Sequence, residues 1–132
     1  MFGKKAQPPI KSLIAHGSRV EGNLKFTEGL RIDGEVVGDV CALTSEPSML
    51  VISEAAIVEG TIQADHVIVN GRVKGPIHAR ELLELQPRAQ IEGDVTYRAL
   101  EMHQGAVIAG QLKPILAEGE EKPLLKLAAN NS

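Results

Sequence analysis

The sequence is poor in aromatic residues and in cysteine, and the shortage of cysteine excludes two classes of protein. Two of the 132 residues are phenylalanine, one is tyrosine and none is tryptophan. The single cysteine, Cys41, cannot form an intramolecular disulfide or a multi-thiolate zinc site, which excludes disulfide-rich secreted scaffolds and zinc fingers. No apolar run approaches the roughly 20 residues that span a bilayer, and no signal-peptide core follows the N-terminal lysines. We therefore expect a cytoplasmic protein.

Positive charge is also in short supply. The formal net charge of -3 argues against a protein that neutralises many phosphates along nucleic acid. Neither a G-x-x-x-x-G-K-[ST] loop nor a G-x-G-x-x-G turn that opens a helix is present. We therefore expect neither a nucleic acid nor a nucleotide as a ligand.

What the sequence contains instead is a repeat centred on glycine. A unit of the form aliphatic-x-Gly-x-aliphatic occurs six times, with the glycines 15 to 22 residues apart. These glycines are Gly22, Gly38, Gly60, Gly75, Gly93 and Gly110. The residue two before each glycine is always Val or Ile, the residue two after is always Val, Ile or Leu, and the positions between are mostly polar. Alternation with a period of two, kept in register over six copies, predicts strands with one buried face.

Repetition of the same residue type at the same place in each unit predicts a β-solenoid, because each rung stacks like side chains on like. A propeller blade needs about twice this period. The repeat glycine is expected at a corner where φ is positive or where a Cβ has no room. Small residues four positions before it keep the interior narrow, which accounts for the shortage of aromatic residues.

The expected fold is an all-β parallel β-helix of about six rungs over residues 12–114. The largest gap between glycines, from Gly38 to Gly60, contains residues 44–48 (TSEPS), whose turn chemistry predicts a loop inserted in one rung. We expect residues 1–11 to form a basic, flexible N-terminal tail and residues 115–132 to form a flexible C-terminal tail.

The four histidines are the residues best suited to chemistry. Stacked rungs could bring His66, His78 and His103 together as a three-histidine metal site. Histidines at surface turns are far commoner, however, and no carboxylate spacing stands out as a second shell. Cys41 falls on an outward position without a local histidine partner, which is typical of an unreactive thiol. We therefore predict no catalytic residue, no cofactor, no metal site and no enzyme.

Three segments resemble the bactofilin family: IDGEVVGDV (32–40), VNGRVKGPI (69–77) and IEGDV (91–95). The resemblance extends from Ile10 to Ile115 and implies a right-handed, roughly triangular β-helix that polymerises end to end into non-polar filaments without nucleotide. It also implies a cytoskeletal scaffold on the inner face of the cytoplasmic membrane that positions enzymes of cell-wall synthesis or hydrolysis and shapes the cell. The start MFGKK is similar to the family's membrane-targeting sequence. This similarity places membrane binding at Met1, Phe2, Lys4 and Lys5.

The ends of a solenoid offer open strand edges, and repeat proteins that stay monomeric cover them with polar caps. Neither end of this chain shows a clear cap, so we expect self-assembly through the first and last rungs. The expected interface residues are Leu13, Ile14, Ile108, Leu112, Ile115 and Leu116. The alternative is that the C-terminal tail, with Leu124, Leu125 and Leu127, folds over the last rung.

Two other classes of function remain open. Apolar residues six apart, as in Ile14, Val20 and Phe26, resemble the repeat of a left-handed hexapeptide acyltransferase. Strict hexads would make every rung 18 residues long, whereas the observed spacing varies from 15 to 22. A non-polymerising adaptor is the other alternative.

Overall fold

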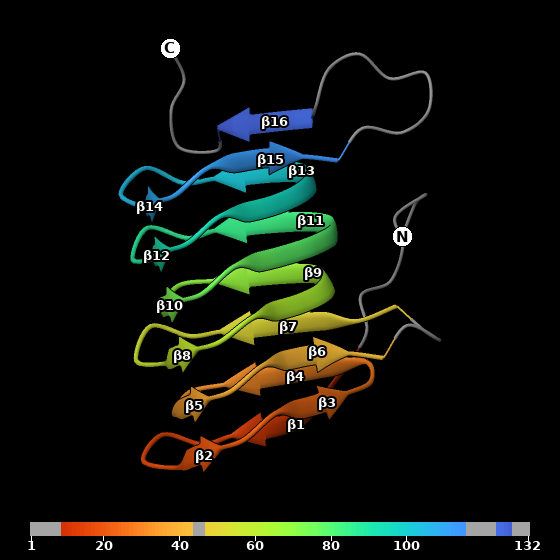
Figure 1. The fold of residues 1–132 in the computed structure, drawn as a ribbon, viewed down its shortest axis with the longest axis vertical. Coiled ribbons are helices and arrows are strands. Elements are labelled where there is room, and N and C mark those ends of the chain that lie inside the picture. The colour runs from red at the N-terminus through yellow and green to blue at the C-terminus, as the bar shows by residue number, and fades with distance from the viewer. Residues whose placement is uncertain (1–8, 44–46, 116–123, 128–132) are drawn as a thin grey trace.

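The computed structural model describes residues 9–43, 47–115 and 124–127, and within these ranges the protein is built of parallel strands without a helix (Figure 1). The strands are β1 (Ile10–Ile14), β2 (Arg19–Glu21), β3 (Leu24–Phe26), β4 (Gly29–Ile32), β5 (Glu35–Val37), β6 (Val40–Ala42), β7 (Met49–Ile52), β8 (Ile57–Glu59), β9 (Ile62–Val69), β10 (Arg72–Lys74), β11 (Ile77–Leu85), β12 (Gln90–Glu92), β13 (Val95–Met102), β14 (Val107–Ala109), β15 (Leu112–Pro114) and β16 (Leu124–Leu127). They stack into a β-solenoid of six rungs, which confirms the predicted fold class.

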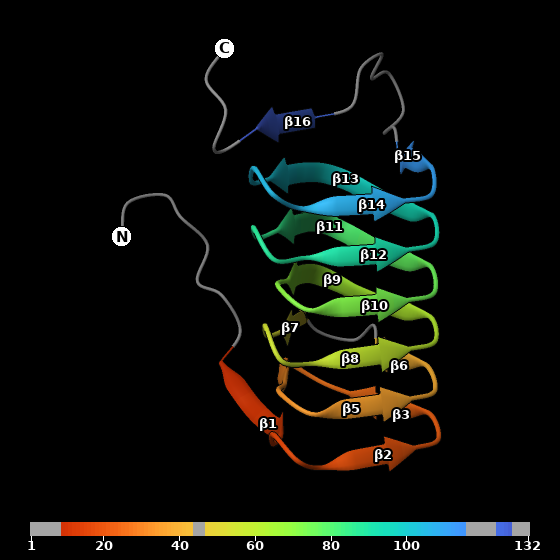
Figure 2. The same ribbon diagram turned by 90° about the vertical axis from the view of Figure 1, so that its left-hand side faces the viewer.

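Each rung contributes one strand to each of three faces. The first face is the sheet β2-β5-β8-β10-β12-β14, seen as a ladder of arrows in Figure 2. The second face contains β3, β6, the first halves of β9, β11 and β13, and β15. The third face contains β1, β4, β7, the second halves of the same three strands, and β16. The second and third faces belong to one sheet because the long strands bend at the corner, where the register of β11 shifts between Ala79 and Leu82.

The interior is a set of columns, each made of residues at the same distance from the repeat glycine. In the middle rungs the columns two before and two after the glycine are fully buried, as shown by Val58 and Ile62 at 0% exposure. The same columns are less buried in the first and last rungs, where Val20 and Ile108 are only half-buried. Burial in this fold therefore depends on having a rung on both sides.

The repeat glycines turn the corner between the first and second faces. Gly38 has φ +148° and Gly60 has φ +150°, a backbone conformation that side-chain-bearing residues rarely adopt. A Cβ on Gly60 would also collide with the carbonyl group of Gly38 in the rung below. Gly22, in the first rung, has φ +134° but open space around it. Both expected reasons for glycine, the positive φ and the lack of room for a Cβ, therefore apply at Gly60. At Gly22, in the first rung, only the positive φ applies.

The loop predicted in residues 44–48 joins β6 to β7, and its residues 44–46 lie outside the described part. The C-terminal end of this loop, at Ser48, is held by a hydrogen bond to the corner of the next rung. The Ser48 N–H donates a 2.9 Å hydrogen bond to Asp65 Oδ2, and Arg80 Nε donates a 2.7 Å hydrogen bond to Asp65 Oδ1. The Asp65 carboxylate therefore links three successive rungs where the insertion interrupts the solenoid.

The structure differs from the prediction at both predicted tails. β1 begins at Ile10, inside the segment predicted as the N-terminal tail. Leu124–Leu127, predicted to be flexible, form β16, which pairs in parallel with β13. The physical reason is that the outer edge of β13 offers unpaired backbone groups, which a further strand satisfies. β16 thereby adds a seventh strand to the third face.

Candidate functional site

The last rung exposes the apolar interior of the solenoid. Leu112 in β15 stacks on the fully buried Val95, yet 48% of Leu112 is exposed. Ile108 in β14 stacks on Ile91 and is half-buried. Ile115 follows β15 and is half-buried, and its N–H donates a 2.6 Å hydrogen bond to a carbonyl oxygen of the rung below. Leu112 and Ile108 are therefore core residues that lack the next rung, whereas the remaining predicted residue, Leu116, lies outside the described residues.

The first rung exposes the interior at the other end. Ile14 stacks on Ile32, which is fully buried, and is itself only half-buried. Leu13 is paired instead with the exposed Arg31, so its side chain, 56% exposed, lies on the outer surface of the third face. The structure thus assigns the two residues of the predicted pair to different surfaces.

Two residues of this end surface were missed by the sequence analysis. Val20 and Leu24 stack on the buried Val36 and Val40 and are themselves half-buried. Both occupy the columns that flank the repeat glycine. The sequence alone could have predicted their exposure, because the first copy of each stacked column has no rung below it.

Strand edges at both ends are open for backbone pairing. Among the described residues, no further strand pairs with the outer edges of β14 and β15, or with those of β2 and β3. The third face is different at the C-terminal end, because β16 covers β13 there. β16 fills the position that a third-face strand of another subunit would take if it continued the helix in the same direction.

The predicted membrane-binding residues Met1, Phe2, Lys4 and Lys5 lie outside the described residues. In the part of the chain that the structure describes, no helix is long and apolar enough to cross a membrane.

The predicted group of three histidines is not assembled. His66 and His103 both lie beside Glu84 on the third face, with each Nε2 atom 3.9 Å from one of its carboxylate oxygens. His78 belongs to the second-face half of β11, where its register partners are Gln63 and Thr96. Glu84 belongs to a different rung from each of the two histidines, which is why spacing along the sequence did not reveal these contacts.

Cys41 lies half-buried in β6. Burial raises the pKa of its thiol, and the neighbouring carboxylate of Asp39 adds to this rise. A thiol with a raised pKa is protonated at neutral pH, so this residue has the character of an inert structural cysteine.

The geometry defines a class of protein, a β-solenoid whose terminal rungs expose core residues and unpaired strand edges where further rungs would stack. The family model for bactofilin, described as polymer-forming cytoskeletal, matches residues 12–113. The chain belongs to the bactofilin family, and we conclude that it is a polymer-forming cytoskeletal protein.

One curated relative has a comparable length. Bactofilin BacO of Myxococcus xanthus is 25% identical over 111 residues, which cover 84% of this chain and 85% of the relative. The search of solved structures found no significant match.

Proposed function

We propose that this protein assembles end to end into non-polar filaments that need no nucleotide and that form a scaffold for cell-wall or cell-shape machinery on the inner face of the membrane. The observation that supports assembly is the exposure of Leu112. This residue is 48% exposed, whereas Val95, directly below it in the same column, is 0% exposed. A rung from another subunit would bury Leu112 as the last rung buries Val95. Burial of each such aliphatic side chain contributes about 1.5 to 3 kcal/mol at most.

The position of β16 supports contacts between like ends. A head-to-tail continuation would place β1 of the next subunit beside β13, where β16 already lies. Joining like ends gives a filament without polarity, because successive subunits alternate in direction.

Electron microscopy tests the assembly directly. We expect the purified, tag-free protein to form filaments in negative stain without nucleotide, and to form the same filaments when ATP or GTP is added. A compact trimer in analytical ultracentrifugation, without filaments, would favour the hexapeptide acyltransferase. A stable monomer at all concentrations would favour the adaptor.

The N-terminal residues are proposed as the membrane anchor. Met1 and Phe2 at the bilayer interface would contribute roughly 3 to 5 kcal/mol before ordering costs, and each of Lys4 and Lys5 about 1 kcal/mol on anionic lipid. One such anchor binds only marginally. A filament carries many anchors, so avidity makes the attachment stable.

Deletion of residues 1–7 is expected to abolish co-sedimentation with anionic liposomes while leaving filaments intact. The reason is that the deletion leaves β1, which begins at Ile10, and all the other described strands in place. Pelleting of the filaments without lipid must be subtracted, so flotation on a density gradient is the better assay. Undiminished flotation of the deletion variant would refute the anchor.

A further inference from the structure

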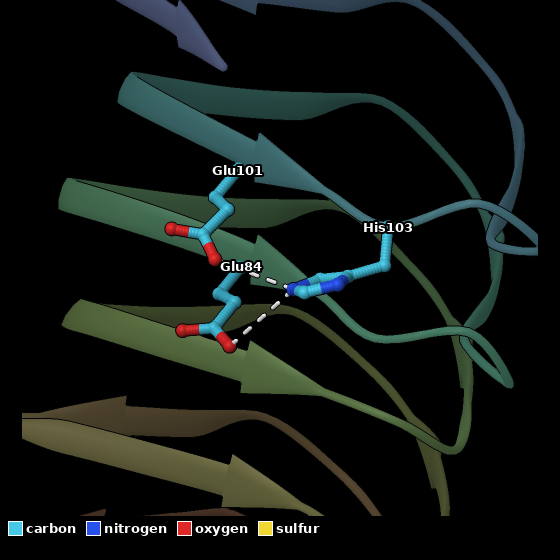
Figure 3. Close-up of side chains that lie close together, drawn as sticks. All are labelled: Glu84, Glu101 and His103. Atoms are coloured by element: carbon cyan, nitrogen blue, oxygen red, sulfur yellow. Dashed lines mark ion pairs between the residues drawn. The ribbon is translucent and has the colours of Figure 1, made fainter. Parts of the chain in front are cut away.

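Two glutamates stack on the outer surface of the third face. Glu84 in β11 and Glu101 in β13 are register partners on neighbouring rungs. Like charges at directly paired positions destabilise a sheet. Figure 3 shows that the two side chains lie one above the other and that His103, which follows β13, turns its ring toward both. The repulsion between these two paired carboxylates therefore needs a compensating positive charge.

The distances describe a cluster of three potential ligands, Glu84, Glu101 and His103, with a second histidine beside it. His103 Nε2 lies 3.3 Å from Glu101 Oε2 and 3.9 Å from Glu84 Oε2. On the other side, His66 Nε2 lies 3.9 Å from Glu84 Oε1. The four side chains are only 16% to 26% exposed. The Glu84 carboxylate thus lies between two imidazole rings, one from β9 and one from the end of β13.

Both histidine nitrogens that face the carboxylates lack a hydrogen-bond partner. The Nε2 atoms of His66 and His103 are buried, and neither donates nor accepts a hydrogen bond. A buried polar atom without a partner is costly and calls for an explanation. A neutral imidazole with a free nitrogen is the form that binds a metal ion.

The spacing fits a small divalent ion. Zinc bonds to imidazole nitrogen and carboxylate oxygen are about 2.0 to 2.2 Å long, so neighbouring ligand atoms in a tetrahedral site lie roughly 3.3 to 3.6 Å apart. Within the cluster, one ligand atom each from Glu84, Glu101 and His103 lie within 4.8 Å of one another, so modest side-chain movement would bring them onto one ion. Imidazole mixed with carboxylate suits Zn²⁺ and related transition metals better than Ca²⁺ or Mg²⁺, which prefer oxygen ligands alone.

A supporting contact orients the central carboxylate. Gln86 Nε2 donates a 2.8 Å hydrogen bond to Glu84 Oε2. Hydrogen bonds of this kind hold ligands in place and are typical of built metal sites.

We propose that Glu84, Glu101 and His103 form a binding site for a divalent transition metal ion of the zinc type, with His66 beside the Glu84 carboxylate. Glu84 lies in β11, Glu101 in β13 and His103 directly after β13, so the bound ion clamps two neighbouring rungs together. It also neutralises the paired glutamates. Because this site lies on the side of the solenoid, its occupancy is separate from the proposed end-to-end assembly. This proposal replaces the prediction of no metal site.

Metal binding is tested with the full-length, tag-free protein, stripped with EDTA and then exchanged into metal-free buffer. Titration with ZnCl2 in a calorimeter is expected to show one Zn²⁺ per chain. Saturation is expected to raise the Tm by roughly 5 °C, because the ion binds the folded but not the unfolded chain. Co²⁺ is expected to give the visible absorption of a tetrahedral nitrogen and oxygen site.

Variants locate the site. Glu84→Gln, which is nearly isosteric and removes the repulsion, and His103→Ala are each expected to weaken Zn²⁺ binding at least tenfold. His78→Ala is the matched control, since it removes a histidine from another face, and it should bind as the parent does. Circular dichroism confirms that each variant is folded. Absence of saturable Zn²⁺ binding, or equal affinity in the parent and in both site variants, would overturn the proposal.

Discussion

Filaments are expected to disappear when Leu112 is replaced by arginine, while the subunit stays folded. Leu112 is 48% exposed in the free subunit, so the longer side chain can extend into water there. In a filament the same side chain would lie against the next rung, and a buried charge without a partner costs several kcal/mol. Because each 1.4 kcal/mol or so is a factor of ten in affinity, the concentration needed for assembly should rise about 100-fold or more. Negative-stain microscopy and sedimentation measure the loss.

Val107→Arg is the matched control for this experiment. Val107 belongs to the same rung and is 55% exposed, but it stacks on the exposed Gln90 rather than on a buried residue. Its side chain therefore lies on the outside of the solenoid and not on its end. Filaments are expected to persist in this variant. Filaments in Leu112→Arg, or their loss in both variants, would refute an interface made by the exposed core of the last rung.

Alanine at Gly60 is expected to lower the free energy of unfolding by about 2 to 6 kcal/mol. Two costs act together at this position. The backbone has φ +150°, which strains any residue with a side chain by about 1 to 3 kcal/mol. The added Cβ would also collide with the carbonyl group of Gly38, and overpacking of a tight interior typically costs about 1 to 3 kcal/mol. Urea unfolding in the Leu112→Arg background measures the change without interference from assembly.

The ends of the stack separate the two costs. Gly22 has φ +134° with nothing within 4 Å of a Cβ, so Gly22→Ala should show the conformational cost alone, about 1 to 2 kcal/mol. Gly110 is not among the glycines with positive φ, but its Cβ would collide with the Gly93 carbonyl, so Gly110→Ala should show the steric cost alone. An effect at Gly60 no larger than that at Gly22 would contradict close stacking of the glycine corners.

Much of the fold could be predicted because the repeat encodes burial and stacking at once. The Val or Ile two before each glycine is the inward residue of one strand, and the same residue in the next copy is its register partner, as Val58 and Val73 show. The end surfaces were predicted less well. Leu13 and Ile14 are adjacent and both apolar, but consecutive residues of a strand point to opposite sides, and only Ile14 continues the buried column.

The solenoid, its six rungs and the glycine corners can be predicted from the sequence, because each of these follows from residues a few positions apart that recur in register. Which side chains of different rungs meet on the outer surface depends on the three-dimensional stacking of the rungs. Glu84 becomes a neighbour of His66 and His103 because of the lengths of the corners between them, including the extra residue of β11 between Ala79 and Leu82. The same holds for β16, which pairs with β13 because that edge was open when the chain returned to the third face. Contacts between rungs depend on where each corner ends, and no pattern within a single rung records that.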